Sequence, residues 1–186
     1  MGIVGKLENV LLAIDNYNRE DPHGREFLYS DRLTQWVYRL NPDPSEALRI
    51  AARGQHIGRW KSPRDTYPMD RVGYLKWRED LKQFHAQTVG ELMGKEGYLP
   101  AEIEAVRQIV LKKNFRVNLE AQTIEDALCL VFLETQFEEL RQKTPDEKMI
   151  DIIKKTWNKM SPQGKSVALT MDLPAHHKEL ILKALR

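Results

Sequence analysis

The chain has 186 residues, of which 41% are hydrophobic and 30% charged, and its formal net charge at pH 7 is +2. This composition is typical of a soluble globular protein, and the length suffices for one domain with a substantial core. No apolar run approaches the length of a membrane span. The single cysteine, Cys129, excludes an internal disulfide and favours a cytoplasmic location.

Hydrophobic residues recur with helical spacing along nearly the whole chain, and no period-two alternation persists. The spacing predicts helices over residues 3–17, 25–40, 45–58, 73–95, 100–113, 118–142 (starting at Asn118 or Thr123) and 146–158. A short piece begins at Ser161-Pro162, and a last helix, carrying His176 and His177, begins at Pro174. We therefore predict an all-α fold over residues 1–186, a single-domain bundle of about seven to eight helices.

The charge is unevenly spread along the chain. Residues 49–82 contain nine basic and four acidic residues, so the rest of the chain carries a net charge of −3. Within this basic segment, residues 61–72 form the longest predicted connection, and connections of that length are often functional. A basic segment beside a histidine-bearing helix indicates an anionic ligand, above all phosphate. A solvated basic surface is the alternative.

Polar residues that can bind a ligand lie on or beside three inward helix faces. Gln55 continues an apolar stripe with His56 on its flank, His85 lies on the inward stripe of residues 73–95, and Glu125-Asp126 precede the apolar run 127–133. Each has a purely structural alternative: the histidines can hydrogen-bond within the core, and Asp126 can cap a helix that starts at Thr123. Imidazole and carboxylate groups together suit a divalent metal such as Mn, Fe, Co, Ni or Zn.

Several segments around these residues form a recognisable pattern: Leu48–Gly58, Phe84-His85-Ala86, Val89–Met93, Gly97, Ile103–Val106 and Glu125-Asp126-Ala127. This pattern resembles the HD superfamily of metal-dependent phosphohydrolases. The resemblance implies an HD-domain-like helical fold and a metal held by His56, His85 and Asp126, with Glu125 or Asp31 as a possible fourth ligand. Gln55 and His56 stand where the superfamily has its His-Asp pair, and neither residues 29–32 nor residues 108–112 contain a histidine. At most one metal is therefore expected.

The chain also resembles an uncharacterised family with bacterial and fungal members, over nearly its whole length. The matching residues are Tyr29-Ser30, Gln55-His56-Ile57, Arg59-Trp60, Tyr67-Pro68-Met69, Glu125-Asp126 and Cys129–Glu134. This second resemblance implies no activity.

Two functions follow as alternatives. The first is a phosphohydrolase acting on a nucleotide or other phosphoester, in which the metal activates water and His56, Asp126 and Glu125 are catalytic. The second is a module that lost the metal and binds a nucleotide or RNA in the same pocket. In both, the expected phosphate-binding residues are Gln55, Arg59, Arg64, Tyr67, Arg71 and Lys113, while Tyr67, Trp60 or Trp77 stacks on a base.

Overall fold

The computed structural model describes residues 5–186, and over this range the chain forms ten α-helices and no β-strand. The first five are α1 (Lys6–Arg19), α2 (Arg25–Leu40), α3 (Glu46–Gly54), α4 (Arg71–Lys95) and α5 (Pro100–Val110). The others are α6 (Leu119–Val131), α7 (Phe137–Gln142), α8 (Asp146–Lys159), α9 (Pro162–Thr170) and α10 (Ala175–Ala184). The predicted all-α single domain is thus confirmed, and no helix in this range is long and apolar enough to cross a membrane.

The prediction of seven to eight helices is wrong, mainly because the predicted helix 118–142 is divided. A π-helical segment, Phe132–Gln136, separates α6 from α7, and hydrophobic periodicity does not reveal such a change of winding. In addition, the short piece at Ser161-Pro162 is a full helix, α9. The start predicted for the first helix, Ile3, lies outside the described residues.

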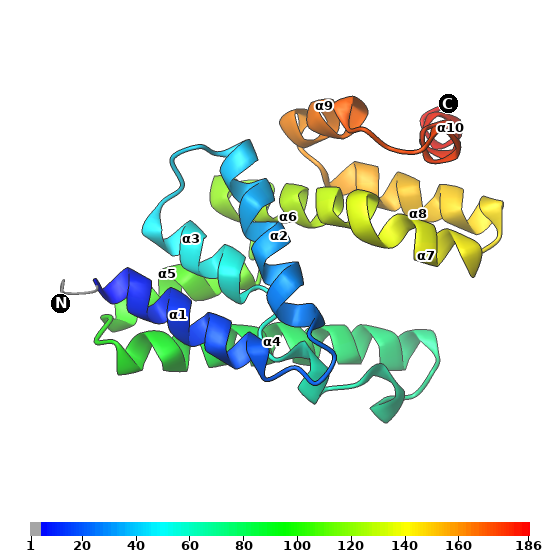
Figure 1. Ribbon diagram of the computed structural model, residues 1–186. Helices are drawn as coiled ribbons and strands as arrows, with labels where there is room; N and C mark the ends of the chain where they lie inside the picture. Colours follow the sequence, from blue (N-terminus) through cyan, green and yellow to red (C-terminus); the bar gives the residue numbers. More distant parts are fainter. Residues whose placement is uncertain (1–4) are drawn as a thin grey trace.

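The helices form two groups that meet at α2 and α6. α1, α3, α4 and α5 pack together, with α4 along the bottom of the view, whereas α6 crosses α2 and α7 to α10 extend toward the upper right (Figure 1). α6 packs against α2 and α5 and so joins the groups. The run Ala127–Leu133, from the second half of α6 into the π-helical segment, is largely buried, as the continuous apolar sequence predicts. A site lined by α4, α6 and α8 therefore draws on both groups.

α3 lies deep in the first group because the residues on its inner face have small side chains. Ala51 and Ala52 are fully buried, and a Cβ on Gly54 would lie 2.3 Å from a methyl carbon of Val89 in α4. Ser45 caps the helix by accepting a hydrogen bond from the backbone N–H of Leu48, as the sequence predicts. The absence of side-chain bulk lets the end of α3 approach α4 closely.

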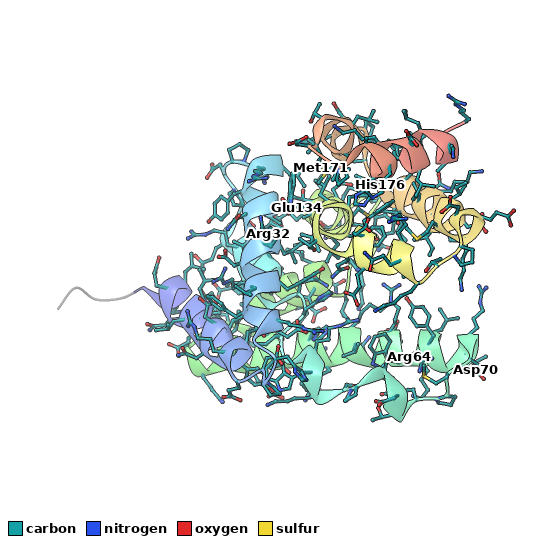
Figure 2. The ribbon with its side chains drawn as sticks, turned by 45° about the vertical axis from the view of Figure 1, so that its right-hand side comes forward. Arg32, Arg64, Asp70, Glu134, Met171 and His176 are labelled. Atoms are coloured by element: carbon teal, nitrogen blue, oxygen red, sulfur yellow. The ribbon has the colours of Figure 1, made fainter. Side chains whose placement is uncertain are left out.

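The connection between α3 and α4 is ordered by its own polar groups. It contains two 3₁₀ turns, Arg59–Lys61 and Arg64–Thr66. The Arg64 guanidinium donates hydrogen bonds to the carbonyls of Tyr67, Pro68 and Asp70. Arg64 and Asp70 accordingly lie together at the start of α4 (Figure 2).

Candidate functional site

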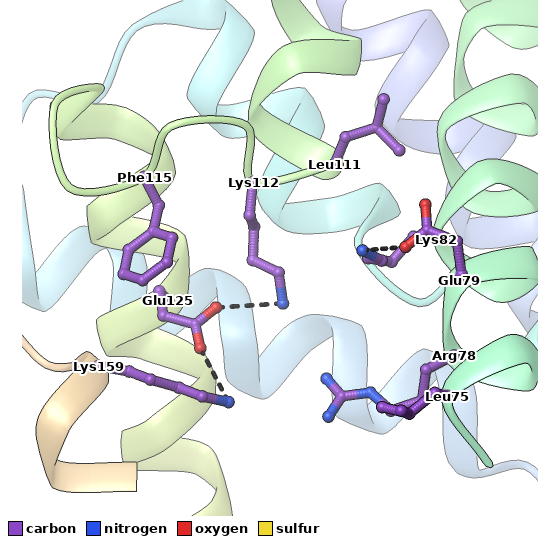
Figure 3. A pocket seen from close by; sticks show the side chains of 9 residues that line it. All are labelled: Leu75, Arg78, Glu79, Lys82, Leu111, Lys112, Phe115, Glu125 and Lys159. Atoms are coloured by element: carbon purple, nitrogen blue, oxygen red, sulfur yellow. Dashed lines mark ion pairs between the residues drawn. The ribbon is translucent and has the colours of Figure 1, made fainter. Parts of the chain in front are cut away.

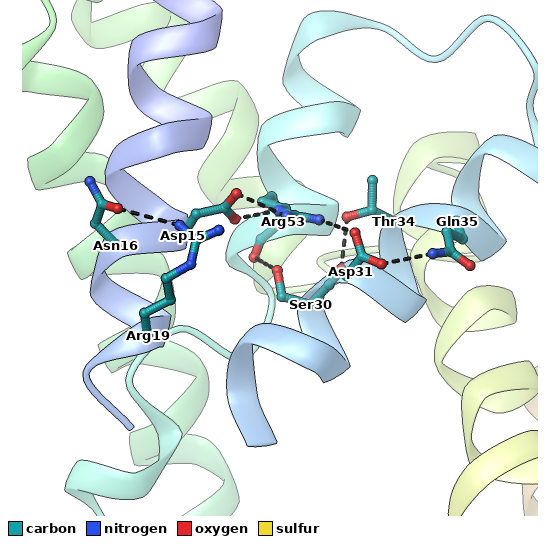
Figure 4. A network of polar contacts seen from close by, with 8 residues as sticks. All are labelled: Asp15, Asn16, Arg19, Ser30, Asp31, Thr34, Gln35 and Arg53. Carbon is teal, nitrogen blue, oxygen red and sulfur yellow. Dashed lines mark hydrogen bonds and ion pairs between the residues drawn. The ribbon is translucent and has the colours of Figure 1, made fainter. Parts of the chain in front are cut away.

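The end of α3 is held in place by an arginine shared between two neighbouring helices. Arg53 donates to both carboxylate oxygens of Asp15 in α1, at 2.5 and 2.9 Å, and to Asp31 in α2, at 3.0 Å. The hydroxyl of Ser30 donates to the Arg53 carbonyl at 2.7 Å (Figure 4). We call Asp15, Ser30, Asp31 and Arg53 the arginine cluster. Asp31 is engaged here rather than beside the histidines.

The chain turns sharply after this cluster and directs Gln55 and His56 inward. Gly58 adopts a left-handed conformation with φ of +66°, and a Cβ there would lie within 2.9 Å of ring atoms of Tyr17 and Phe84. The turn therefore requires glycine, both for its backbone angle and for the space.

His56 and His85 meet below this turn, and the sequence predicts His85 on an inward helix stripe and His56 on the flank of another. Their ring centroids lie 5.7 Å apart, and His56 stacks on Tyr29 with a centroid separation of 4.4 Å. Gln55 and His85 are buried, with exposed fractions of 2% each. We call Gln55, His56, His85 and Tyr29 the histidine cluster.

The hydrogen bonds of the histidine cluster are incomplete. Nδ1 of His85 lies 2.7 Å from the Ile57 carbonyl, so it carries the proton and leaves the Nε2 lone pair as an acceptor. Neither Nε2 of His85 nor Oε1 of Gln55 has a hydrogen-bond partner among the residues described, although the Gln55 amide donates to the Val110 carbonyl. Buried acceptors without a partner are rare in folded proteins. Here they indicate a place for a water molecule or a ligand.

Both histidines are held in their neutral form at pH 7. Burial lowers the pKa of His56 well below 6.5, and the nearby charges of Arg59, Lys112 and Arg78 lower it further. Burial also lowers the pKa of His85 to about 4, despite its hydrogen bond to Ile57. A neutral imidazole can accept a proton from a substrate or from water.

Two of those cations, Arg78 and Lys112, also line a cavity of about 300 Å³ between α4, the α5–α6 connection, α6 and the end of α8 (Figure 3). Its wall also contains Leu75, Glu79, Lys82, Leu111, Phe115, Glu125 and Lys159. We call this cavity the basic pocket. Four of its side chains are cations and two are carboxylates, which leaves an excess of positive charge.

Glu125 lies at the base of the basic pocket with an exposed fraction of 6%. It pairs with Lys112 at 3.1 Å and with Lys159 at 3.5 Å. Burial alone would raise the pKa of Glu125, but the two lysines outweigh it and hold that pKa below the ordinary value. Glu125 is therefore ionised, and it holds two lysines at the pocket without neutralising both.

Asp126 faces away from the histidines although it follows Glu125 in sequence. Its carboxylate accepts hydrogen bonds from the backbone and the hydroxyl of Ser161, at 2.8 and 2.5 Å, and from the Gln122 amide at 3.0 Å. In residues 5–186, His56, His85 and Asp126 do not form a group whose ligand atoms lie within 4.8 Å of one another. The structure thus brings the two imidazoles together but leaves Asp126 bound at the start of α9, so these three residues do not fit one metal.

The predicted phosphate-binding residues divide between two other places. Arg59 and Arg64 line a second cavity of about 240 Å³ with Trp60 and Trp77, and the Arg59 guanidinium lies over the Trp77 ring at 4.8 Å. Glu26 lies in the same wall, and its burial raises its pKa to about 7. Trp60 and Trp77 therefore lie at a cavity distinct from the basic pocket.

The remaining predicted residues lie outside both cavities. The Tyr67 hydroxyl donates to Asp80 at 3.0 Å, and Arg71 and Lys113 are exposed. Lys112, one position before Lys113, lines the basic pocket instead, because its φ of 54° turns the chain at the end of α5. Sequence spacing does not register a left-handed residue of this kind.

The sequence pointed to Tyr29 only through the family resemblance, and it did not single out the four cations of the basic pocket, Arg78, Lys82, Lys112 and Lys159. Arg78 and Lys82 are four positions apart on α4, which places them on one helix face. That spacing was visible in the basic segment. The contribution of Lys159 was not, because α8 reaches the pocket through tertiary packing.

Comparison with known proteins places the chain in a family. The family model described as "Domain of unknown function (DUF4202)" matches residues 8–181. This agrees with the predicted resemblance to a family without a known activity, and it provides no link to the HD superfamily. The chain matches none of the curated proteins and none of the solved structures.

Proposed function

Because the chain belongs to the DUF4202 family, whose description states no function, we propose its function from the site itself: the basic pocket binds a phosphorylated small molecule, such as a nucleotide. The observation that carries the proposal is the convergence of Arg78, Lys82, Lys112 and Lys159 on one cavity. Its volume of about 300 Å³ is at the lower end of the range for ligand sites.

The excess of positive charge in the basic pocket suits an anion better than a neutral ligand, and a phosphate dianion would balance it. Lys82 pairs with Glu79, and Lys112 and Lys159 share Glu125, but the exposed Arg78 makes no ion pair with any described residue. A guanidinium can bind two phosphate oxygens at once. Arg78 thus supplies the uncompensated charge, and the lysines complete the anion site.

Titration of the protein with pyrophosphate, followed by calorimetry at low salt, tests this proposal. We expect Arg78→Gln to weaken binding by about ten- to a hundredfold, because hydrogen bonds to charged groups are worth about 1.5–3 kcal/mol. Arg71→Gln is the matched control, since Arg71 is an exposed arginine two turns earlier on α4 and outside the pocket. The absence of binding in the wild type, or equal loss in both variants, would contradict the proposal.

RNA is the alternative ligand, and salt distinguishes it. Binding to a nucleic acid that contacts many phosphates falls steeply as salt increases. If a single-stranded RNA oligomer binds more tightly than pyrophosphate and Arg71→Gln weakens it as much as Arg78→Gln does, an extended surface rather than the pocket is the site.

Hydrolysis of the bound phosphoester is a second candidate, favoured by the neutral His56. The cations that lower its pKa include Arg78 and Lys112 of the pocket, and its ring nitrogens have no hydrogen-bond partner within residues 5–186. In this mechanism His56 would accept the proton of the attacking water, as a weaker base than a free imidazole because its pKa is lowered. The HD resemblance instead implies a metal-bound nucleophile, which the position of Asp126 does not support.

A panel of phosphoesters with added Mn²⁺, Co²⁺, Ni²⁺ or Mg²⁺, and with chelator, separates these mechanisms. Turnover that His56→Gln abolishes and chelator leaves unchanged would support His56 as the base. Turnover that requires the metal and is lost in Asp126→Asn would restore the metal-dependent alternative.

A further inference from the structure

A second group of histidines lies where α10 meets α7 and shares no residue with the basic pocket. Nε2 of His176 and Nε2 of His177 both approach Oε2 of Glu138, at 2.9 and 2.7 Å. The three ligand atoms all lie within 4.8 Å of one another. His176 lies on the C-terminal part of the molecule, apart from Arg64 and Asp70 (Figure 2).

More groups converge on Glu138 than its carboxylate can accept. Arg141 donates to both oxygens, at 2.7 and 3.1 Å, and Gln142 donates to Oε1 at 3.0 Å. With the two imidazoles there are five partners, whereas an ionised carboxylate offers about four lone-pair sites. Three of the five partners crowd onto Oε2, so hydrogen bonds alone leave one imidazole nitrogen poorly satisfied.

We propose that Glu138, His176 and His177 bind a divalent transition-metal ion, with Zn²⁺ as the best fit. Two imidazoles and one carboxylate form a recognised zinc ligand set that leaves a fourth position for water. Ligand atoms about 2.0–2.2 Å from a tetrahedral zinc lie roughly 3–3.5 Å apart, so small outward shifts of the imidazoles would admit the ion. In that state each imidazole offers its Nε2 lone pair to the metal, and Arg141 stays on the carboxylate.

The two helices that supply the ligands are separated by more than thirty residues of chain. Glu138 belongs to α7, whereas His176 and His177 lie in the first turn of α10, which also packs on α8. His177 is buried and its ring contacts the Phe137 ring in a tilted arrangement, with centroids 4.4 Å apart, while His176 is exposed. A bound metal would therefore fasten the last helix to α7, with one ligand fixed in the core and one free to exchange.

Calorimetric titration of tag-free, chelator-treated protein with ZnCl₂ tests this site. We expect one equivalent of zinc per chain in the wild type. Loss of a residue that only hydrogen-bonds to a metal ligand commonly weakens metal binding about 10–100-fold, so removal of a ligand itself in His176→Ala or Glu138→Gln should weaken it at least tenfold. His23→Ala is the control, because His23 is an exposed histidine in the turn before α2.

Hydrogen exchange provides a second measurement that does not depend on the heat of binding. Zinc should slow exchange of the amides in α10 in the wild type and in His23→Ala, but not in His176→Ala. His176 is exposed, so its replacement leaves the fold intact. A wild type that binds no zinc, or a His176→Ala variant that binds it equally, would show that the three residues are a hydrogen-bonded contact only and would overturn the proposal.

Discussion

The arginine cluster and the histidine cluster are neighbours, since Arg53 of the first lies two residues before Gln55 of the second. Their hydrogen bonding nevertheless differs. Arg53 has three hydrogen bonds to two carboxylates, and its own carbonyl accepts from Ser30. In the histidine cluster, Gln55 and His85 each retain an acceptor for which the described part of the chain offers no donor. A satisfied cluster stabilises the fold, whereas an unsatisfied one has capacity left for a ligand.

The largest expected effect comes from breaking the satisfied cluster. Arg53→Met should lower the free energy of unfolding by about 3–4 kcal/mol, because it leaves Asp15 buried without its cation. The side chains of Arg53 and Asp15 are only 12% and 16% exposed. Urea denaturation of the variant and the wild type measures the difference.

Lys76→Met is the control for that experiment. Lys76 pairs with Asp80 at 2.9 Å, but both side chains are exposed, so the loss should stay below about 1 kcal/mol. Similar losses in the two variants would contradict the distinction between the arginine cluster and an ordinary surface ion pair.

A somewhat smaller effect is expected from titrating the histidine cluster. The pKa of His85 is lowered to about 4, so between pH 6.5 and 4 the unfolded chain binds more protons than the folded one. Protonation of His85 in the unfolded chain therefore lowers the free energy of unfolding as pH falls from 6.5 to 4, by up to about 3 kcal/mol. Above pH 6.5 this loss is absent. The wild type should gain stability relative to His85→Gln as pH rises from 4.5 to 7.

Glu26 provides a control of opposite sign in the same pH range. Because burial raises its pKa to about 7, the folded state binds the extra proton, and the wild type should lose stability relative to Glu26→Gln as pH rises. Denaturation curves at several pH values measure both slopes. If the stability curves of wild type and His85→Gln run parallel with pH, the folded environment does not lower the pKa of His85.

Much of this fold could be predicted from the sequence because capping and helix-breaking residues mark the ends of the helices. The cap at Ser45 and the inward positions of Gln55 and His85 follow from spacing and capping alone. The π-helical segment 132–136 could not be predicted, since it leaves the pattern of buried residues almost unchanged.

The candidate site could be predicted only for residues whose orientation follows from the periodicity of a single helix. His85 was found because it lies on the inward face of α4. His56 was predicted on the flank of the stripe that ends at Gln55; it lies in the turn after α3, and the two rings meet. Asp126 lies on the adjoining face of α6, where Ser161 binds it, and no local pattern distinguishes it from Glu125. Which of two neighbouring carboxylates faces a pocket depends on the packing of α8 and α9, and the sequence does not specify that packing directly.

The smallest expected effect on stability is that of Tyr29→Phe. This variant also tests most directly whether the histidine cluster, unlike the arginine cluster, serves a ligand. The Tyr29 hydroxyl forms no hydrogen bond within residues 5–186, although its ring stacks on His56. Tyr29→Phe should therefore change the free energy of unfolding by no more than about 0.5 kcal/mol. Tyr29 does not line the basic pocket. If the bound ligand extends from that pocket to the histidine cluster, the variant should bind pyrophosphate about two- to tenfold more weakly, the value of one neutral hydrogen bond.

Tyr98→Phe should behave in the opposite way. Its hydroxyl donates to Glu46, which links the end of α4 to α3, so its removal should cost about 1 kcal/mol of stability and leave pyrophosphate affinity unchanged. Denaturation and calorimetry on the same two variants measure both quantities. If Tyr29→Phe loses stability as Tyr98→Phe does, its hydroxyl contributes to the fold, and the histidine cluster is part of the core rather than a place for a ligand.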